Sequence, residues 1–217
     1  MSSEPTLPRE SRPQKKGLRF SFNSPLILTY TLISGILIIL YEALGPVGQE
    51  ITNNYFTVPG NGSGFNPVSW EFFRLFSHAF GHGSWSHFFG NFTIILLIGP
   101  VLEERYGSGL LGLMIFVTAL FTGVLNSVFF STGLLGASGI AFFMIILISF
   151  TNIRKGEIPL TMILVALIYL GKEIFEAMNP DTVSQFAHLF GGAMGIIFGF
   201  LFANKGGKGK SVEDSIS

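Results

Sequence analysis

Ser138 lies in the segment Gly136-Ala137-Ser138-Gly139, at the start of a strongly apolar run. A serine hydroxyl becomes a nucleophile when a neighbouring histidine can take its proton. His188, in another apolar run, is a candidate for that base. Small residues such as these are also typical of close contacts between membrane helices. A nucleophile and a simple packing contact are therefore both open for Ser138.

The chain's four histidines, His78, His82, His87 and His188, raise a second kind of chemistry, the binding of a metal ion. His78 and His82 are four residues apart, a spacing that suits two ligands on one helix face. Asn91, four residues after His87, is a poor ligand for zinc. Cysteine is absent, which excludes disulfides, thiol chemistry and cysteine metal sites. The metal alternative ranks below catalysis and stays open.

The elements that must position these residues are those of a membrane protein. Of the 217 residues, 48% are hydrophobic and 12% charged, and the mean hydropathy is +0.55. Apolar segments of spanning or nearly spanning length lie at residues 25–44, 85–102, 109–130, 138–153, 158–177 and 184–203. The predicted fold class is an all-α membrane protein with six transmembrane helices and a long outer loop at 45–84. The formal net charge of zero argues against a nucleic-acid partner.

The basic residues predict the orientation of these helices. If six spans alternate, only Arg74 and Lys172 among the 13 Lys and Arg residues fall on the opposite side from the rest. By the positive-inside rule both termini are cytoplasmic, and the loops at 45–84, 131–137 and 178–183 face outward. The first span is too long for a signal-peptide core, so we expect an anchor and not a cleaved leader.

Counting residues to the charged end of each helix places three polar residues at one depth. Ser138 lies 16 residues before Arg154, His188 lies 17 before Lys205, and His87 lies 16 before Glu103. That is roughly 24 Å from the inner boundary of a hydrocarbon core about 30 Å thick. Polar groups at that depth usually face a protein interior or a water-filled cavity. The spacing therefore predicts one site below the outer surface, with Asn91 one turn deeper than His87.

Local features on three segments bear on this site. Ser138 should occupy the first turn of its helix, where free N–H groups favour a nearby anion. Gly191, Gly195 and Gly199, spaced by four, predict a close-packing helix face that would bring His188 within hydrogen-bond reach of Ser138. The loop from 131 to 135 should dip inward with water. Its polar neighbours either line a water-filled basin or cap a helix end, and both interpretations remain open: Asn126, Ser127, Ser131 and Thr132.

These residues together resemble the rhomboid family of intramembrane serine proteases, over roughly residues 25–203. The family's Gly-x-Ser-Gly motif is matched by residues 136–139, and its His-x-x-x-Asn element by residues 87–91. Its Ala-His-x-x-Gly-x-x-x-Gly element is matched by residues 187–195, and its Glu-x-Arg-x-Gly turn by residues 103–107.

The resemblance implies a serine endopeptidase that cleaves membrane-anchored proteins within or next to their transmembrane segments. It implies Ser138 and His188 as a catalytic dyad, with the oxyanion held by the Ser138 N–H, His87 and Asn91, and with no cofactor or metal. Glu173 and Glu176 are the only acids near that level, and neither is given a role as a third member. Supporting roles fall to His82, Phe142, Gly136, Gly139, Gly191 and Gly195. The implied partners are single-span or other membrane-protein substrates and the lipid bilayer, with a lateral gate at 171–183.

Composition predicts a basic cytoplasmic tail at 1–24 and a disordered cytoplasmic tail, rich in Gly, Lys and Ser, at 204–217. Between them lies the predicted six-span catalytic domain at 25–203. Such a minimal form suggests a prokaryotic inner membrane, with the site opening to the outer face. The chain departs from the family twice, with Phe73-Arg74 for the usual Trp-Arg pair and Phe142 where many bacterial members have tyrosine. Two other functions stay open, a non-proteolytic rhomboid-like binding protein and a histidine-based metal or solute transporter.

Overall fold

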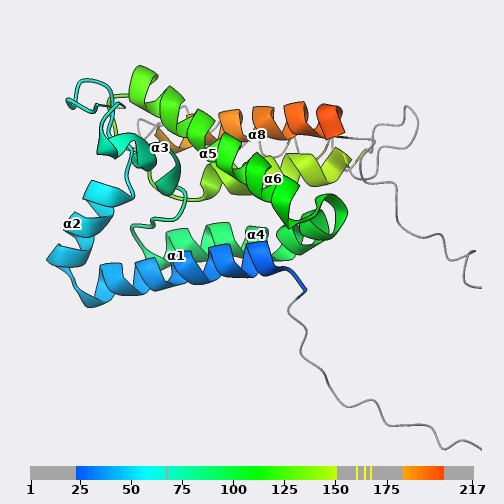
Figure 1. The fold of residues 1–217 in the computed structure, drawn as a ribbon, viewed down its shortest axis with the longest axis horizontal. Coiled ribbons are helices and arrows are strands. Elements are labelled where there is room, and N and C mark those ends of the chain that lie inside the picture. The colour runs from blue at the N-terminus through cyan, green and yellow to red at the C-terminus, as the bar shows by residue number, and fades with distance from the viewer. Residues whose placement is uncertain are drawn as a thin grey trace, which may run out of the picture.

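The computed structural model describes residues 23–66, 68–150, 160, 164, 167 and 183–202, and helices dominate this part of the chain (Figure 1). The α-helices are α1 (Pro25–Ala43), α2 (Pro46–Tyr55), α3 (Arg74–Ser77), α4 (Trp85–Tyr106), α5 (Ser108–Phe129), α6 (Ser138–Ser149) and α8 (Val183–Phe202). A 3-10 turn, Trp70–Phe73, leads into α3. In Figure 1, α1 and α4 run side by side, as do α6 and α8, and α5 crosses between the two pairs.

Three of these helices, α1, α4 and α5, are long and apolar enough to cross a membrane. Two shorter apolar helices, α6 and Phe186–Phe202 of α8, accompany them. Lipid-facing surfaces are apparent from exposed apolar side chains, such as Leu32 on α1 and Leu97 on α4. The chain is therefore an all-helical integral membrane protein.

The helix bounds agree closely with four of the six predicted segments, those at 25–44, 85–102, 109–130 and 184–203. The segment predicted at 138–153 is shorter, because α6 ends at Ser149. The fifth predicted span at 158–177, the gate at 171–183 and the two acids Glu173 and Glu176 lie outside the described residues, apart from positions 160, 164 and 167 and Val183 at the start of α8. So do the predicted tails at 1–24 and 204–217, except residues 23 and 24.

Helix α6 lies at the centre of the packing. Every residue from Gly139 to Leu147 is buried, so the middle of this helix is enclosed by neighbouring segments on all faces. Its neighbours are chiefly α8 and α4, and the core between them includes Phe143 of α6, Phe92 of α4 and Met194 of α8. Ser138 therefore begins a helix whose position is fixed on all sides.

The N-terminus of α1 is held by a buried carboxylate from the far end of α4. Glu103 accepts the backbone N–H groups of Leu26 and Ile27 at 2.9 and 3.1 Å, and the Ser108 hydroxyl at 2.6 Å. Backbone N–H groups in the first turn of a helix have no partner within it, and a carboxylate also suits the helix dipole. Glu103 thus links α1, α4 and the start of α5. The sequence indicates only that Glu103 marks the charged end of a helix, and it does not predict this role.

Replacing Glu103 by alanine is expected to destabilise the fold by about 3 kcal/mol, because it leaves buried N–H groups without an acceptor. The exposed neighbour Glu104 offers a matched control, since Glu104→Ala removes the same charge from the surface. Denaturation midpoints of the purified protein in one detergent would measure both. Equal stability of the two variants would show that the Glu103 contacts do not hold α1.

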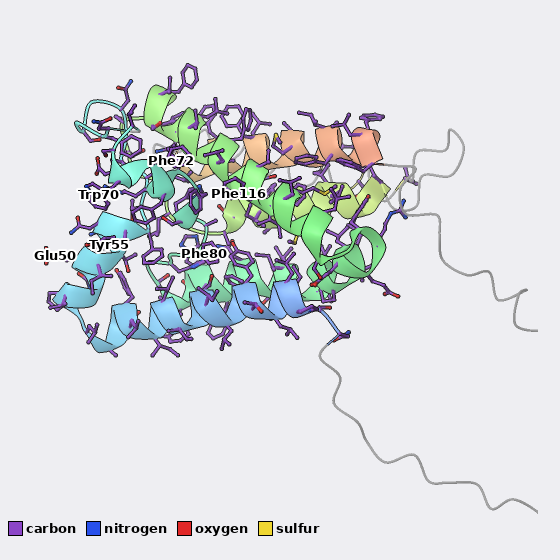
Figure 2. All side chains as sticks on the ribbon, in the orientation of Figure 1. Glu50, Tyr55, Trp70, Phe72, Phe80 and Phe116 are labelled. Atoms are coloured by element: carbon purple, nitrogen blue, oxygen red, sulfur yellow. The ribbon has the colours of Figure 1, made fainter. Side chains whose placement is uncertain are left out.

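The segment between α1 and α4, predicted as a loop, contains α2, the 3-10 turn and α3. Its aromatic side chains gather beside α2, where Trp70 stacks on Phe73 with ring centroids 5.9 Å apart and contacts Tyr55 (Figure 2). Arg74 is buried and donates to the carbonyls of Thr57 and Asn53 and to Glu71. Phe73, which stands at the position expected to be tryptophan, packs against Tyr55 and Trp70.

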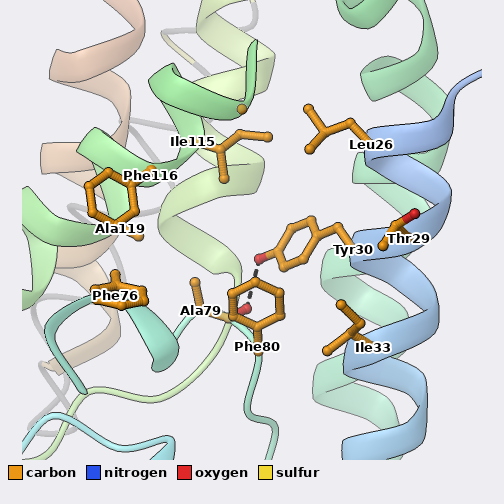
Figure 3. A pocket seen from close by; sticks show the side chains of 11 residues that line it. Leu26, Thr29, Tyr30, Ile33, Phe76, Ala79, Phe80, Ile115, Phe116 and Ala119 are labelled. Carbon is orange, nitrogen blue, oxygen red and sulfur yellow. Dashed lines mark hydrogen bonds between the residues drawn. The ribbon is translucent and has the colours of Figure 1, made fainter. Parts of the chain in front are cut away.

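An apolar cavity of about 300 Å³ lies between α1, α3 and α5. Tyr30 of α1 points into it, and its hydroxyl donates to the Ala79 carbonyl at 2.7 Å (Figure 3). The same ring meets Phe80 and Phe92 edge-on. Tyr30 thereby ties the turn after α3 to α1, and this turn leads to His82 and the start of α4.

Candidate active site

Ser138 is the first residue of α6, as its spacing predicted, and the loop before it is drawn into the protein. Leu134 pairs with Val58 through two backbone hydrogen bonds of 3.0 and 2.9 Å. The Gly136 N–H donates to the His78 carbonyl at 2.9 Å. Leu134, Gly136 and Ala137 are all buried, whereas Ser138 is half-buried. Ser138 therefore begins a buried helix, while its own side chain remains partly accessible.

Gly136 is required for both its backbone and its lack of a side chain. Its φ of +117° is a conformation that L side chains rarely adopt. A Cβ built on it would lie 2.5 Å from both Nε2 and Cε1 of His87. The imidazole of His87, in the first turn of α4, therefore occupies the space beside the segment that carries Ser138.

Helix α8 packs backbone to backbone against the start of α6, with no room for a side chain between them. A Cβ on Gly191 would overlap the Gly139 carbonyl oxygen and would lie 2.9 Å from Gly139 Cα. A Cβ on Gly139 would lie 3.2 Å from the Ala187 carbonyl oxygen, and one on Gly195 only 2.7 Å from that of Phe143. The predicted glycine face is confirmed, and it places residues 187–191 directly against the residue after Ser138.

His188 lies within that contact, and its ring is held flat against Phe142. The two ring centroids are 4.2 Å apart and the rings are 6° from parallel. Phe142 is four residues after Ser138, so the two side chains lie on the same face of α6. His188 is buried, with 7% of its surface exposed. The imidazole therefore packs on the face of α6 that carries Ser138.

Asn91 and His82 form a hydrogen-bonded pair behind Ser138. Asn91 Nδ2 lies 3.1 Å from His82 Nε2, and the Ala137 N–H points to the same nitrogen from 3.4 Å. His82 Nδ1 lies 3.2 Å from the Phe80 carbonyl oxygen. Both side chains are buried. Sequence reasoning gave His82 a supporting place in the loop and did not foresee its contacts with Asn91 and with the residue before Ser138.

Other polar residues near this site have local partners. His78 Nε2 lies 3.1 Å from the Ala119 carbonyl oxygen. Asn126 donates to the Thr132 carbonyl at 3.0 Å and the Ser127 hydroxyl to the Val124 carbonyl at 2.9 Å, contacts that close the end of α5. Across the residues that the structure describes, no three His, Asp or Glu side chains are grouped as metal ligands would be.

The assembled residues suit acyl-transfer chemistry. Ser138 offers a hydroxyl, His188 an imidazole stacked on the same helix, and His87 and Asn91 two polar side chains that come from α4. Ser138 also begins α6, where backbone N–H groups and the positive end of the dipole favour a developing negative charge. Asn91 and His188 are buried and Ser138 and His87 are half-buried, and interactions of such groups are stronger than those in water.

Comparison with known protein families gives a match to the Rhomboid domain over residues 69–205. The matched region runs from the 3-10 turn before α3 to just beyond α8, and it contains every residue of the candidate site. It covers more than half of the 217 residues. The chain is thus an integral membrane protein that belongs to the rhomboid family of intramembrane proteases.

Proposed function

We propose that this protein is an active serine endopeptidase that cleaves membrane-anchored proteins within or next to a transmembrane segment. The observation that carries the proposal is the contact of α8 with the start of α6, which packs His188 on Phe142 one turn after Ser138. Inactive members occur in protein families of enzymes, and they need not keep a nucleophile and base in this arrangement. The chain has both residues, on two closely packed helices.

In this proposal His188 takes the proton from Ser138 Oγ as the oxygen attacks the scissile carbonyl. His188 then gives that proton to the leaving amine. In the second step His188 takes a proton from water, which attacks the acyl carbonyl, and returns it to Ser138 Oγ as the acyl group is released. No carboxylate is assigned to orient the imidazole. The parallel stacking on Phe142 serves that purpose, and it needs only a flat ring, so the missing tyrosine hydroxyl does not remove it.

The oxyanion is bound on the other side of the reacting carbonyl. We assign its donors as the Ser138 backbone N–H, the Asn91 amide and a ring N–H of His87. His87 lies against Gly136, and Asn91 is linked through His82 to Ala137, and these contacts with the two residues before Ser138 support the assignment. Each such donor typically contributes about 3 kcal/mol to transition-state stabilisation.

The proposal includes the topology expected from the sequence: six spans in a catalytic domain at 25–203, cytoplasmic tails at 1–24 and 204–217, and a site that opens to the outer face. Its partners are then single-span or other membrane-protein substrates, which enter from the bilayer. The basic-residue distribution supports this orientation, and the small six-span form supports a prokaryotic plasma membrane.

The direct test uses the full-length protein reconstituted in lipid vesicles with a model single-span substrate. We expect one or a few cuts near the outer end of the substrate's transmembrane segment, mapped by mass spectrometry. A fluorophosphonate probe, which labels activated serines, should modify Ser138 and no other serine. Substrate that binds but is never cut, with no labelling of Ser138, would favour the non-proteolytic binding protein instead.

Replacing Asn91 by alanine is expected to lower kcat about 100-fold by removing one oxyanion donor, with a smaller effect on KM. Labelling of Ser138 by the probe should slow in parallel, since the phosphonate oxygen occupies the same donors. Thr118→Ala provides a control, because this residue is also buried and its hydroxyl donates to the Met114 carbonyl within α5. Unchanged kcat in Asn91→Ala would remove Asn91 from the oxyanion site.

A further inference from the structure

We propose that His82 is a positioning residue which, in the Nδ1-protonated tautomer, orients the Asn91 amide and the Ala137 peptide for the oxyanion. This inference rests on the proposed function for its catalytic consequence. His82 itself stays behind the site and does not touch substrate. It acts through the two groups that its Nε2 lone pair holds.

The backbone fixes the tautomer. A carbonyl oxygen can only accept, so the contact between Nδ1 and the Phe80 carbonyl requires a proton on Nδ1. A backbone N–H can only donate, so the contact from Ala137 requires a lone pair on Nε2. Neither backbone group can exchange its role as donor or acceptor. A neutral imidazole with its proton on Nδ1 satisfies both, and no other form does.

This tautomer in turn fixes the orientation of Asn91. Because Nε2 offers only a lone pair, the amide must present its NH₂ group to it, as the 3.1 Å contact with Nδ2 shows. One N–H of that group is then directed to His82. The second N–H projects from the same nitrogen in a fixed plane. Without His82, the amide could turn and place its oxygen where a donor is needed.

The Ala137 contact acts on the nucleophile segment itself. The Ala137 N–H belongs to the planar peptide that joins Gly136 and Ala137, so holding it fixes the plane from which the Ala137 φ of −87° and ψ of 9° direct the next N–H, that of Ser138. The Gly136 N–H is held by the His78 carbonyl at 2.9 Å. Two consecutive amides before Ser138 are therefore bound by the turn at residues 78–82, one of them through the His82 ring.

The surroundings of His82 keep the ring in place and neutral. Its exposed fraction is 1%, and it meets Phe88 and Phe92 edge-on with centroids 5.5 Å away in each case. Tyr30 secures the Ala79 carbonyl next to the Phe80 carbonyl that His82 uses (Figure 3). Burial, together with the neighbouring His87, lowers the pKa of His82 to about 4, which is consistent with a neutral ring at physiological pH.

The kinetic test is a double-mutant cycle on the full-length protein in lipid. We expect His82→Ala to lower kcat about 10-fold with KM nearly unchanged, and to cost only about threefold when Asn91 is already alanine, because the contact with Ala137 is then the one that remains to be lost. His82→Gln, whose side-chain oxygen can replace the Nε2 acceptor, should restore part of kcat. The control is His78→Gln, which alters a buried histidine bonded to Ala119 and should be additive with Asn91→Ala. Additive effects of His82→Ala and Asn91→Ala would overturn the proposal.

A second measurement does not depend on activity. In the ¹⁵N spectrum of histidine-labelled protein, the signals lost in His82→Gln should be those of a protonated Nδ1 and an unprotonated Nε2. They should stay constant from about pH 8 to about pH 5, unlike a solvent-exposed histidine. A protonated Nε2 would refute the inference even in an active enzyme. If that tautomer is present but wild-type protein cleaves nothing, the proposed function fails and the placement of His82 stands.

Discussion

Replacing Ser138 by alanine is expected to abolish peptide cleavage, lowering kcat by at least about 10⁴-fold. The nucleophile is lost, and neither His87 nor Asn91 can replace it. His188→Ala should have nearly the same effect, because a serine hydroxyl without a base is a weak nucleophile. The double variant should be little worse than either single one, since two residues that act as a unit do not contribute additively.

The measurement is the initial rate of cleavage of a single-span substrate, with both variants checked for folding by their denaturation midpoints. Ser149→Ala is the matched control, because Ser149 is on the same helix and its hydroxyl donates to the Ile145 carbonyl one turn earlier. Its rate should equal that of wild type. Cleavage that persists in Ser138→Ala and His188→Ala alike would exclude the dyad and return Ser138 to a packing role.

The location of Ser138 and His188 could be predicted because membrane helices obey simple length rules. The apolar runs gave the bounds of α1, α4, α5 and α8 within a few residues, since a bilayer demands continuous apolar segments. Counting inward from charged helix ends then placed Ser138, His87 and His188 at one depth. The glycines at 191 and 195 indicated the close contact that brings α8 to α6.

Other features depend on contacts between distant parts of the chain and have no local signal. Glu103 looked like an ordinary charged helix end, yet it is buried and caps α1, 77 residues away along the chain. The segment at 45–84 read as a loop because its helices are short. The role of His82 depends on which carbonyl and which N–H contact its ring. The N–H comes from Ala137, 55 residues away along the chain, so no local pattern could predict this contact.

Among the predicted structural variants, Gly191→Ala is expected to have the largest effect for the smallest change, a single methyl group. That methyl would overlap the Gly139 carbonyl oxygen, and backbone atoms cannot move aside as a flexible side chain can. Helix α8 must therefore shift away from α6 just where His188 meets Phe142. Overpacking of this kind costs about 3 kcal/mol of stability, and a displacement of about 1 Å between reacting groups can lower the rate 100-fold.

Gly192→Ala is the matched control, because it adds the same methyl to the next position of α8. There the new Cβ would have only an ordinary contact, 3.7 Å from Ile146 Cγ1. Both changes raise helix propensity by the same amount, about 1 kcal/mol, so any difference between them reports the contact with α6. We expect Gly192→Ala to match or exceed wild type in stability and to retain its rate, while Gly191→Ala loses both. Equal rates in the two variants would mean that the distance between α6 and α8 does not limit the reaction, and the helix contact would then be structural alone.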